Sequence, residues 1–229
     1  MQGILLVDKP AGWTSFDVVN YVRRIVASAA GKKPKHCKVG HTGTLDPFAT
    51  GLLVLLIGKE YTRQAQSLSK VDKTYEVTMQ LGTTSTTGDP EGELSIVPGV
   101  VPTEAAVLEV LEQFRGQITQ IPPIYSAIKV NGQRAYALAR AGQAVAMVPR
   151  PATIHRLDVS NYSYPFIAYS ADVGSGTYLR TLSEDIATAL GSGAYTLALR
   201  RTRVGQFDIA DACQVEGLNP EKMLERLLG

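Results

Sequence analysis

The sequence predicts an α+β fold, because strand patterns and helix patterns both recur along the chain. Its 229 residues are 45% hydrophobic, which is enough for one large core or two modest domains. Apolar and polar residues alternate over 73–81 and 166–173, as they do in half-buried strands. Apolar residues recur at helical spacing over 18–29, 107–114 and 179–190. We therefore expect a sheet with packed helices.

The first sixty residues predict a strand, a helix and a second strand. Residues 3–7 form a short apolar segment that ends at a turn containing Pro10 and Gly12. Thr14 and Asp17 have the spacing of a capping box, which marks the start of a helix. The apolar stripe of this helix is expected to be Val18, Val22, Ile25 and Ala29. The continuous apolar run 52–57 predicts a strand that is covered on both faces.

The remaining elements follow from local signals. Thr103 is expected to cap a helix that Gly116 ends, and Asn131-Gly132 is a tight-turn signal. The strand at 153–159 should be a neighbour of the strand at 166–173 in the sheet. The other expected elements are an amphipathic segment at 60–68, a polar connection at 82–93 to which no chemistry is assigned, a helix at 134–140, a strand at 193–204 and a helix at 220–228.

Charge is distributed unevenly along the chain. The 23 basic and 21 acidic residues nearly cancel to a net charge of +2. No Asp or Glu occurs from residue 18 to residue 45, whereas this stretch contains six cationic residues, Arg23, Arg24, Lys32, Lys33, Lys35 and Lys38. This local clustering predicts a polyanionic substrate. In the segment 28–38, a solvated surface is the alternative to phosphate contact.

The segment 39–52 reads V-G-H-T-G-T-L-D-P-F-A-T-G-L and contains one carboxylate, Asp46. Its glycines allow unusual backbone conformations or close approach to a ligand, and Pro47 restricts the backbone directly after the acid. An Asp before Pro is most often an ordinary turn residue. The segment as a whole favours a site, because it places a restrained acid beside the apolar strand and beyond the cationic stretch.

Residues 40–52 resemble the G-H-T-G-T-L-D-P-x-A-T-G-L block of the TruB family of pseudouridine synthases, which modify the T-loop of tRNA. The resemblance implies that Asp46 is the catalytic residue and that His41 helps to hold the RNA loop. K-x-Y-x-V at 73–77 resembles a second motif and implies that Tyr75 stacks on the target base. S-G-T-Y-L-R at 175–180 resembles a third, in which the arginine pairs with the catalytic aspartate. This third motif implies that Tyr178 and Arg180 bind the substrate. L-R-R-T-x-x-G at 199–205 resembles a further element of the family and implies that Leu199 lies against the target base.

Two further blocks extend the resemblance and supply candidate contacts to RNA phosphates. D-K-P-x-G-x-T-S-x-D-V-V at 8–19 resembles the family's first motif, and the resemblance implies a chiefly structural role around the site. Lys9 in this block is a lesser candidate contact, and a solvated turn lysine is the simpler interpretation. P-P-x-Y-S-A-x-K-x-x-G-x-R-A-Y-x-L-A-R at 122–140 contains Lys129 and Arg134, and a solvated helix face accounts for its arginines equally well.

The resemblance implies a pseudouridine synthase fold, with a mixed, largely antiparallel sheet flanked by helices and a central active-site cleft. It implies a catalytic domain at 1–215 and a short C-terminal helical tail at 216–229, without the RNA-binding PUA domain of many relatives. The implied reaction is the cofactor-free isomerisation of uridine 55 in the tRNA T-loop to pseudouridine. We expect a cytoplasmic monomer that binds the T stem-loop of tRNA and needs no metal, no membrane and no obligatory protein partner. Cys37 and Cys213 form neither a disulfide framework nor a zinc pattern.

Two other functions remain open at this point. The pocket could grip the T-loop as an RNA-folding chaperone, with or without catalysis. A guide-RNA-dependent relative is the other alternative, and it would require partner proteins. The route of the reaction also stays open between attack on the sugar, attack on the base and a glycal intermediate.

Overall fold

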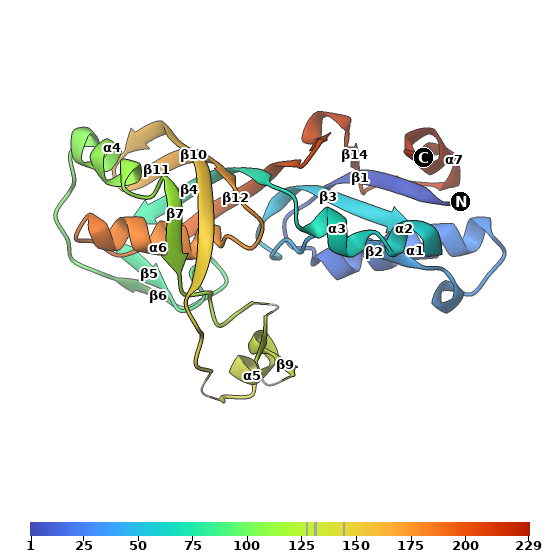
Figure 1. Ribbon diagram of the computed structural model, residues 1–229, viewed down its shortest axis with the longest axis horizontal. Coiled ribbons are helices and arrows are strands. Elements are labelled where there is room, and N and C mark those ends of the chain that lie inside the picture. The colour runs from blue at the N-terminus through green and yellow to red at the C-terminus, as the bar shows by residue number, and fades with distance from the viewer. Residues whose placement is uncertain (127, 131, 144) are drawn as a thin grey trace. The chain divides into compact units, whose positions relative to one another are not determined.

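The computed structural model describes residues 1–126, 128–130, 132–143 and 145–229 (Figure 1). The chain divides into two compact units. Unit 1 combines Met1–Tyr75 with Leu199–Gly229, and unit 2 is Glu76–Ala198. The chain passes between the units inside two strands, β4 (Lys73–Leu81) and β12 (Ala194–Val204).

Unit 1 contains a mixed sheet in which β3 (Thr50–Ile57) is central. β3 is antiparallel to β1 (Gly3–Lys9) and to β2 (Val39–His41), and β12 runs parallel to it. Two short strands complete the sheet, β14 (Cys213–Gln214) beside β1 and β13 (Phe207–Asp208) beside β12.

The predicted double coverage of β3 is confirmed, since every residue from 52 to 57 is fully buried. Alternate side chains of β3 belong to two separate apolar clusters. Leu53 and Leu55 pack with α1 (Ser15–Ala29) and α7 (Pro220–Arg226). Leu52 and Val54 belong to the cluster that contains the last residue of β12, Val204, and the residue Phe207 that follows this strand.

The helix at 15–29 begins as predicted. The side chain of Thr14 accepts a hydrogen bond from the Asp17 N–H, and the Asp17 carboxylate accepts one from the Thr14 N–H. The predicted stripe is wrong at its C-terminal end, because Ala29 is exposed and Val26 and Ala27 are buried instead. The reason is that α1 packs against β1 and β3 over a wider face than a strict four-residue spacing describes.

The C-terminal residues are part of the core of unit 1. Met223 on α7 is fully buried in the same cluster as β1, and the backbone of Leu228 pairs with that of Ile4. The expected helical tail at 216–229 therefore packs as part of this unit. The other short helices of unit 1 are η1 (Pro34–His36), α2 (Lys59–Thr62), α3 (Ala65–Ser69) and η2 (Ile209–Asp211), of which α2 and α3 replace the single amphipathic segment expected at 60–68.

Unit 2 contains the strand order β12, β4, β11, β10 and β7, covered by helices. The predicted pairing of β10 (Arg150–Ser163) with β11 (Phe166–Val173) is confirmed and antiparallel. β7 (Gly116–Gln120) pairs with β10 but was not expected from the sequence. The helices are α4 (Glu104–Glu112), capped by Thr103 as predicted, and α6 (Leu179–Ala189), which packs on β11 through a buried Tyr169–Ser183 hydrogen bond of 2.9 Å.

Unit 2 also contains two short hairpins. β5 (Thr83–Ser85) and β6 (Leu94–Ile96) pair within the stretch expected to be an irregular connection. β8 (Lys129–Val130) and β9 (Gln133–Arg134) pair around the predicted tight turn, whose Asn131 lies outside the described residues, and α5 (Ala135–Arg140) follows. Among the described residues, no helix is long and apolar enough to cross a membrane.

Candidate active site

Asp46 lies in the loop that joins β2 to β3 in unit 1, residues 42–49, which we call the Asp46 loop. Leu45 and Ala49 are buried on either side of the partly exposed aspartate. The Ala49 N–H donates to the Asp46 carbonyl at 3.1 Å, which closes a turn directly after the acid. Asp46 is thus held between two buried residues of a tight loop.

Arg201 on β12 anchors this loop from inside the protein. Its side chain is almost fully buried, with 1% of its surface exposed. Its Nε donates to the Leu52 carbonyl at 2.8 Å, and its Nη2 donates to the Gly43 carbonyl at 3.0 Å. One guanidinium therefore joins the beginning of the Asp46 loop to the strand that follows it.

Gly51 makes this arrangement sterically possible. Its φ is +103°, and a Cβ atom at this position would lie 2.3 Å from the Arg201 carbonyl oxygen. The sequence suggests that this glycine allows a ligand to come close to the backbone. In the structure, the close neighbour of Gly51 is β12, the strand that carries Arg201.

Lys9 anchors the other side of the loop. Its ammonium group donates to the carbonyls of Pro10, Trp13 and Pro47 at 2.8, 2.7 and 3.2 Å. The side chain has no exposed surface. The interpretation of Lys9 as a solvated turn lysine is wrong, because the structure places its charge inside the protein, where it positions the residue that follows Asp46. A contact of Lys9 with RNA stays a prediction.

Ser15, the first residue of α1, completes the anchoring of the loop. Its Oγ donates to the Leu45 carbonyl at 3.0 Å and accepts a hydrogen bond from the Leu45 N–H at 2.8 Å. We call Lys9, Ser15 and Arg201 the anchoring residues. Sequence reasoning missed Ser15 and the role of Arg201, because their partners are 30 to 158 residues away and leave no local pattern.

The other predicted site residues of unit 1 lie on three strands of the sheet. β2 precedes the Asp46 loop, β12 pairs with β3, and β4 is the next strand after β12. His41 is the last residue of β2, and Tyr75 and Leu199 are 7% and 8% exposed on β4 and β12. The alternation of β4 is confirmed, with Tyr75 on its buried face. The stacking of Tyr75 and Leu199 on a base stays a prediction.

Lys73 is a third buried cation near the Asp46 loop, after Arg201 and Lys9. A Cβ atom on Gly43 would lie 3.5 Å from Arg201 Nη1 and 3.6 Å from Lys73 Cε, so both side chains lie beside this glycine. Lys73 donates to the carbonyls of Ser69 and Val71 at 3.0 and 2.6 Å. Burial and the nearby guanidinium of Arg201 lower the pKa of Lys73 to about 8.

Tyr178 and Arg180 lie at the start of α6 in unit 2. Tyr178 is the N-cap residue, and its N–H and carbonyl both bond to the side-chain amide of Gln120, at 3.1 and 3.2 Å. Gln120 is buried, and no pattern in the sequence distinguishes it from other polar residues. It fixes the backbone from which the tyrosine side chain projects.

Arg180 is 5% exposed and has a carboxylate partner, as its place in the first turn of a helix predicts. Within unit 2 that partner is Asp89, with 3.2 Å between Nη1 and Oδ2. The guanidinium also donates to the carbonyls of Thr87 and Tyr125. The pairing of Arg180 with Asp46 stays a prediction.

Asp89 has a structural role in the connection at 82–93, to which the sequence assigns no chemistry. It is 3% exposed, and its Oδ1 accepts hydrogen bonds from the Thr87 hydroxyl and the Glu91 N–H at 2.5 and 3.1 Å. Its sequence context, Asp-Pro-Glu-Gly, is that of a surface turn. The buried pairing arises only from the fold of unit 2.

The other sequence-based candidates gain no new evidence. Lys129 and Arg134 lie on β8 and β9, but their side chains are outside the described part of the structure. Within the described residues, no group of three His, Cys, Asp or Glu side chains could hold a metal ion. Cys37 and Cys213 are free thiols.

Comparison with known proteins identifies the family. Residues 30–179 match the N-terminal domain model of TruB family pseudouridylate synthases, and residues 180–228 match a C-terminal domain model of tRNA pseudouridylate synthase B. The tRNA pseudouridine synthase B of Azoarcus sp. is 45% identical over 100% of this chain and 74% of its own. That of Burkholderia mallei is 43% identical over 99% and 72%. The chain therefore belongs to the TruB family of pseudouridylate synthases.

Solved structures confirm the pseudouridine synthase fold. A chain of a Cbf5–Nop10–Gar1 complex has a TM-score of 0.70 and 30% identity over 93% of this chain. A chain of an H/ACA RNP bound to a substrate RNA has a TM-score of 0.68 and 26% identity over 94% of this chain. This protein spans about half the length of either solved chain, 52% in both cases.

The anchoring role of Arg201 predicts a large stability loss in Arg201→Met. The buried Leu52 carbonyl and the partly buried Gly43 carbonyl lose their donor, which should cost about 3 kcal/mol. Urea unfolding followed by the fluorescence of Trp13, the single tryptophan, reports on unit 1. The control is Arg203→Met on the same strand, an exposed arginine bonded to Thr74, with an expected cost below about 1 kcal/mol. Equal losses in the two variants would contradict the role of Arg201.

The lowered pKa of Lys73 predicts a pH dependence with a defined sign. Between pH 8 and 10.5 the unfolded chain binds a proton at Lys73 that the folded chain has released, so the stability contribution of Lys73 rises with pH in this window. The unfolding free energy of the wild type minus that of Lys73→Met should therefore become more positive from pH 7.5 to pH 10. Trp13 fluorescence in urea measures it at each pH, and a constant difference would contradict the shift.

The buried pair in unit 2 predicts that Asp89→Asn is destabilising by about 3 kcal/mol, because the substitution removes the negative charge that is bonded to the buried guanidinium of Arg180. Asp158→Asn is the matched control, since this carboxylate also bonds to arginines in unit 2 but is 45% exposed. It should cost less than about 1 kcal/mol. Urea unfolding followed by circular dichroism compares the two, and a small loss in both would show that the Asp89 pair contributes little.

Proposed function

We propose that this protein converts uridine 55 in the T-loop of tRNA to pseudouridine, with Asp46 as the catalytic residue. One observation carries the proposal. The Asp46 loop is anchored on both sides of the acid, in a chain that is 45% identical over its whole length to a protein named tRNA pseudouridine synthase B. Fixed placement of a reactive group is what catalysis by positioning requires.

The reaction is an isomerisation, so no atom is added to the nucleotide overall. The bond between N1 of uracil and C1′ of ribose breaks, the base rotates, and C5 bonds to C1′. C5 then loses its proton, and N1 gains one. Because no electrons are exchanged with another molecule, the proposed reaction needs no cofactor.

Asp46 acts in its ionised form, either as a nucleophile or as a base toward the sugar or the uracil. In this proposal the guanidinium of Arg180 pairs with the Asp46 carboxylate when the active site is assembled, which favours the charged form. The bonds of Arg180 to Asp89, Thr87 and Tyr125 support this role, because they restrict its orientation before substrate binds.

A stacked T-loop uridine must leave the loop before it can react. Extruding a nucleotide costs a few kcal/mol, which stacking on an aromatic ring can offset. We assign this stacking to Tyr75, with Leu199 and Tyr178 against the extruded nucleotide and His41 against the RNA loop. The burial of Tyr75 and Leu199 on their strands supports these roles, since it fixes both side chains in advance.

The protein is proposed to act on tRNA by itself as a cytoplasmic monomer. The similar chains in solved structures come from complexes with partner proteins or RNA. Those complexes are properties of the solved proteins, and the proposal for this protein includes no such partner. Turnover by the purified protein on a tRNA transcript, with no other macromolecule present, tests this independence directly.

Asp46→Asn should abolish the reaction and leave tRNA binding within about threefold of the wild type, because the substitution removes a charge and keeps the shape of the side chain. Release of tritium from C5 of labelled uridine in a tRNA transcript measures the reaction, and filter binding measures affinity. Asp158→Asn is the control and should react at the wild-type rate.

Three results would contradict the proposal in different ways. Tritium release by Asp46→Asn at the wild-type rate would exclude Asp46 as the catalytic residue. Binding of tRNA by the wild type without any release would instead favour an RNA-folding chaperone. Release from a transcript with cytidine at position 55 would show that a different uridine reacts.

A further inference from the structure

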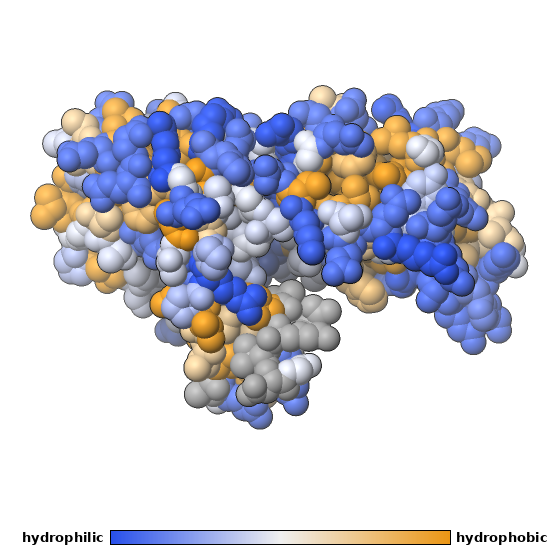
Figure 2. Space-filling view, viewed as in Figure 1, coloured by the Kyte–Doolittle hydropathy of each residue, from blue (hydrophilic) through white to orange (hydrophobic). Residues whose placement is uncertain are grey.

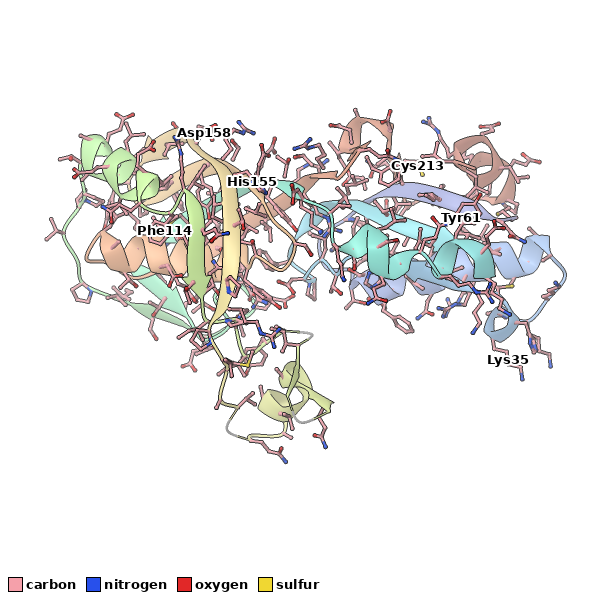
Figure 3. All side chains as sticks on the ribbon, in the orientation of Figure 1. Lys35, Tyr61, Phe114, His155, Asp158 and Cys213 are labelled. Carbon is pink, nitrogen blue, oxygen red and sulfur yellow. The ribbon has the colours of Figure 1, made fainter. Side chains whose placement is uncertain are left out.

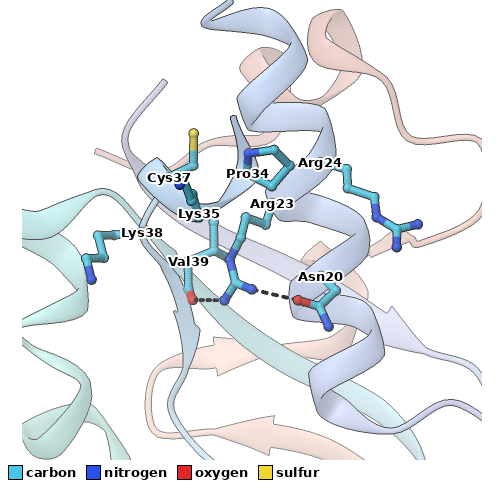
Figure 4. A pocket seen from close by; sticks show the side chains of 8 residues that line it. All are labelled: Asn20, Arg23, Arg24, Pro34, Lys35, Cys37, Lys38 and Val39. Carbon is cyan, nitrogen blue, oxygen red and sulfur yellow. Dashed lines mark hydrogen bonds between the residues drawn. The ribbon is translucent and has the colours of Figure 1, made fainter. Parts of the chain in front are cut away.

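Unit 1 carries a basic hollow that the proposed chemistry does not use. It has a volume of about 660 Å³ and lies between α1 and the segment that leads into β2. Four cationic side chains line it together with Asn20 and Val39, and these cations are Arg23, Arg24, Lys35 and Lys38 (Figure 4). No acidic residue is among the described residues that line it.

The hollow is partly organised before any ligand binds. Arg23 donates to the Asn20 side-chain oxygen at 2.6 Å and to the Val39 carbonyl at 3.2 Å (Figure 4). Its guanidinium also lies over the ring of Phe16, 5.7 Å from the centroid. An arginine held in this way loses little conformational freedom when it meets an anion.

The remaining cations are exposed to solvent. Arg24, Lys35 and Lys38 are all exposed, and Lys35 points away from the body of unit 1 (Figure 3). In Figure 2 hydrophilic residues cover this part of unit 1, at the lower right of the view. Four like charges around one hollow repel each other, and a polyanion would relieve that repulsion.

The backbone connects the hollow rigidly to the Asp46 loop. Lys38 directly precedes β2, and its carbonyl accepts a hydrogen bond from the Gly58 N–H at 2.8 Å. His41 is three residues further along β2, which is roughly 10 Å in an extended strand. The hollow is therefore fixed, within one unit, a short distance from the residues proposed to hold the T-loop.

We propose that the basic hollow binds backbone phosphates of the substrate tRNA, outside the nucleotide that reacts. This inference rests on the proposed function, because it assigns a second contact to the same substrate. Lysine and arginine contacts to phosphate position a nucleic acid without reading its sequence. The exposed lining side chains are charged apart from Pro34, so the lining exposes no large apolar side chain that could insert into a membrane.

The chain offers a matched pair of variants. Lys35→Gln with Lys38→Gln removes two charges from the hollow. Lys32→Gln with Lys33→Gln removes two equally exposed charges from the same loop, at positions that do not line the hollow. All four side chains are exposed, so both double variants should fold, and Trp13 fluorescence in urea checks this.

The experiment measures binding of an unmodified tRNA transcript at several KCl concentrations. The Lys35/Lys38 variant should bind about tenfold more weakly. The slope of log affinity against log salt should fall by about two, because two phosphates are no longer neutralised by lysine. The Lys32/Lys33 variant should stay within about threefold of the wild type. Single-turnover tritium release at subsaturating protein should fall with the affinity in the Lys35/Lys38 variant and stay at the wild-type rate in the Lys32/Lys33 variant.

The outcomes separate this inference from the proposed function. Equal affinity and equal salt slopes for the two double variants would overturn the inference while wild-type tritium release continues. Absence of wild-type release would instead overturn the proposed function. Vesicles containing phosphatidylserine provide the last arm, since a loss of vesicle binding with unchanged tRNA binding would assign the hollow to a membrane surface and overturn the inference.

Discussion

The structure of the candidate site depends on the hydrogen bonds that buried side chains make to the backbone of the Asp46 loop. The Asp46 loop contains Gly43 and is followed by Gly51, so its backbone has little conformational preference of its own, and its buried carbonyls need donors. Lys9, Ser15 and Arg201 supply those donors from three different elements. The cost is electrostatic, because two cations, Lys73 and Arg201, are buried beside Gly43, and the lowered pKa of Lys73 is its consequence.

Unit 2 applies the same principle to Arg180. A guanidinium in the first turn of a helix meets the unfavourable end of the helix dipole. Asp89 and two backbone carbonyls offset this and keep the group in one orientation. The Asp89 segment is fixed in turn, because the Thr196 N–H donates to the Gly88 carbonyl and Gly88 has a φ of +71°. Each unit therefore presents its functional side chains already oriented by its own interior.

Features encoded locally were predictable from the sequence, and features created by tertiary contacts were not. The apolar run of β3, the alternation of β4 and the cap at Thr14 each depend on neighbouring residues. Asp46 was identifiable because the whole segment 40–52 matches a motif that is specific to one family. An aspartate before a proline would not have been informative by itself. Asp89 and Arg180 are 91 residues apart, and Ser15 and Leu45 are 30 apart, so no periodicity connects them. β7, with the polar sequence G-Q-I-T-Q, is a strand only because β10 lies beside it.

Charge in this protein has two separate uses, which the net value of +2 conceals. Lys9, Lys73 and Arg201 are buried cations that donate hydrogen bonds to backbone carbonyl oxygens. The cations of the basic hollow are exposed or half-buried, and their field extends into solvent over about one Debye length, roughly 8 Å at physiological salt. The interior cations therefore set the geometry of the Asp46 loop, and the surface cations favour binding of a polyanion next to it.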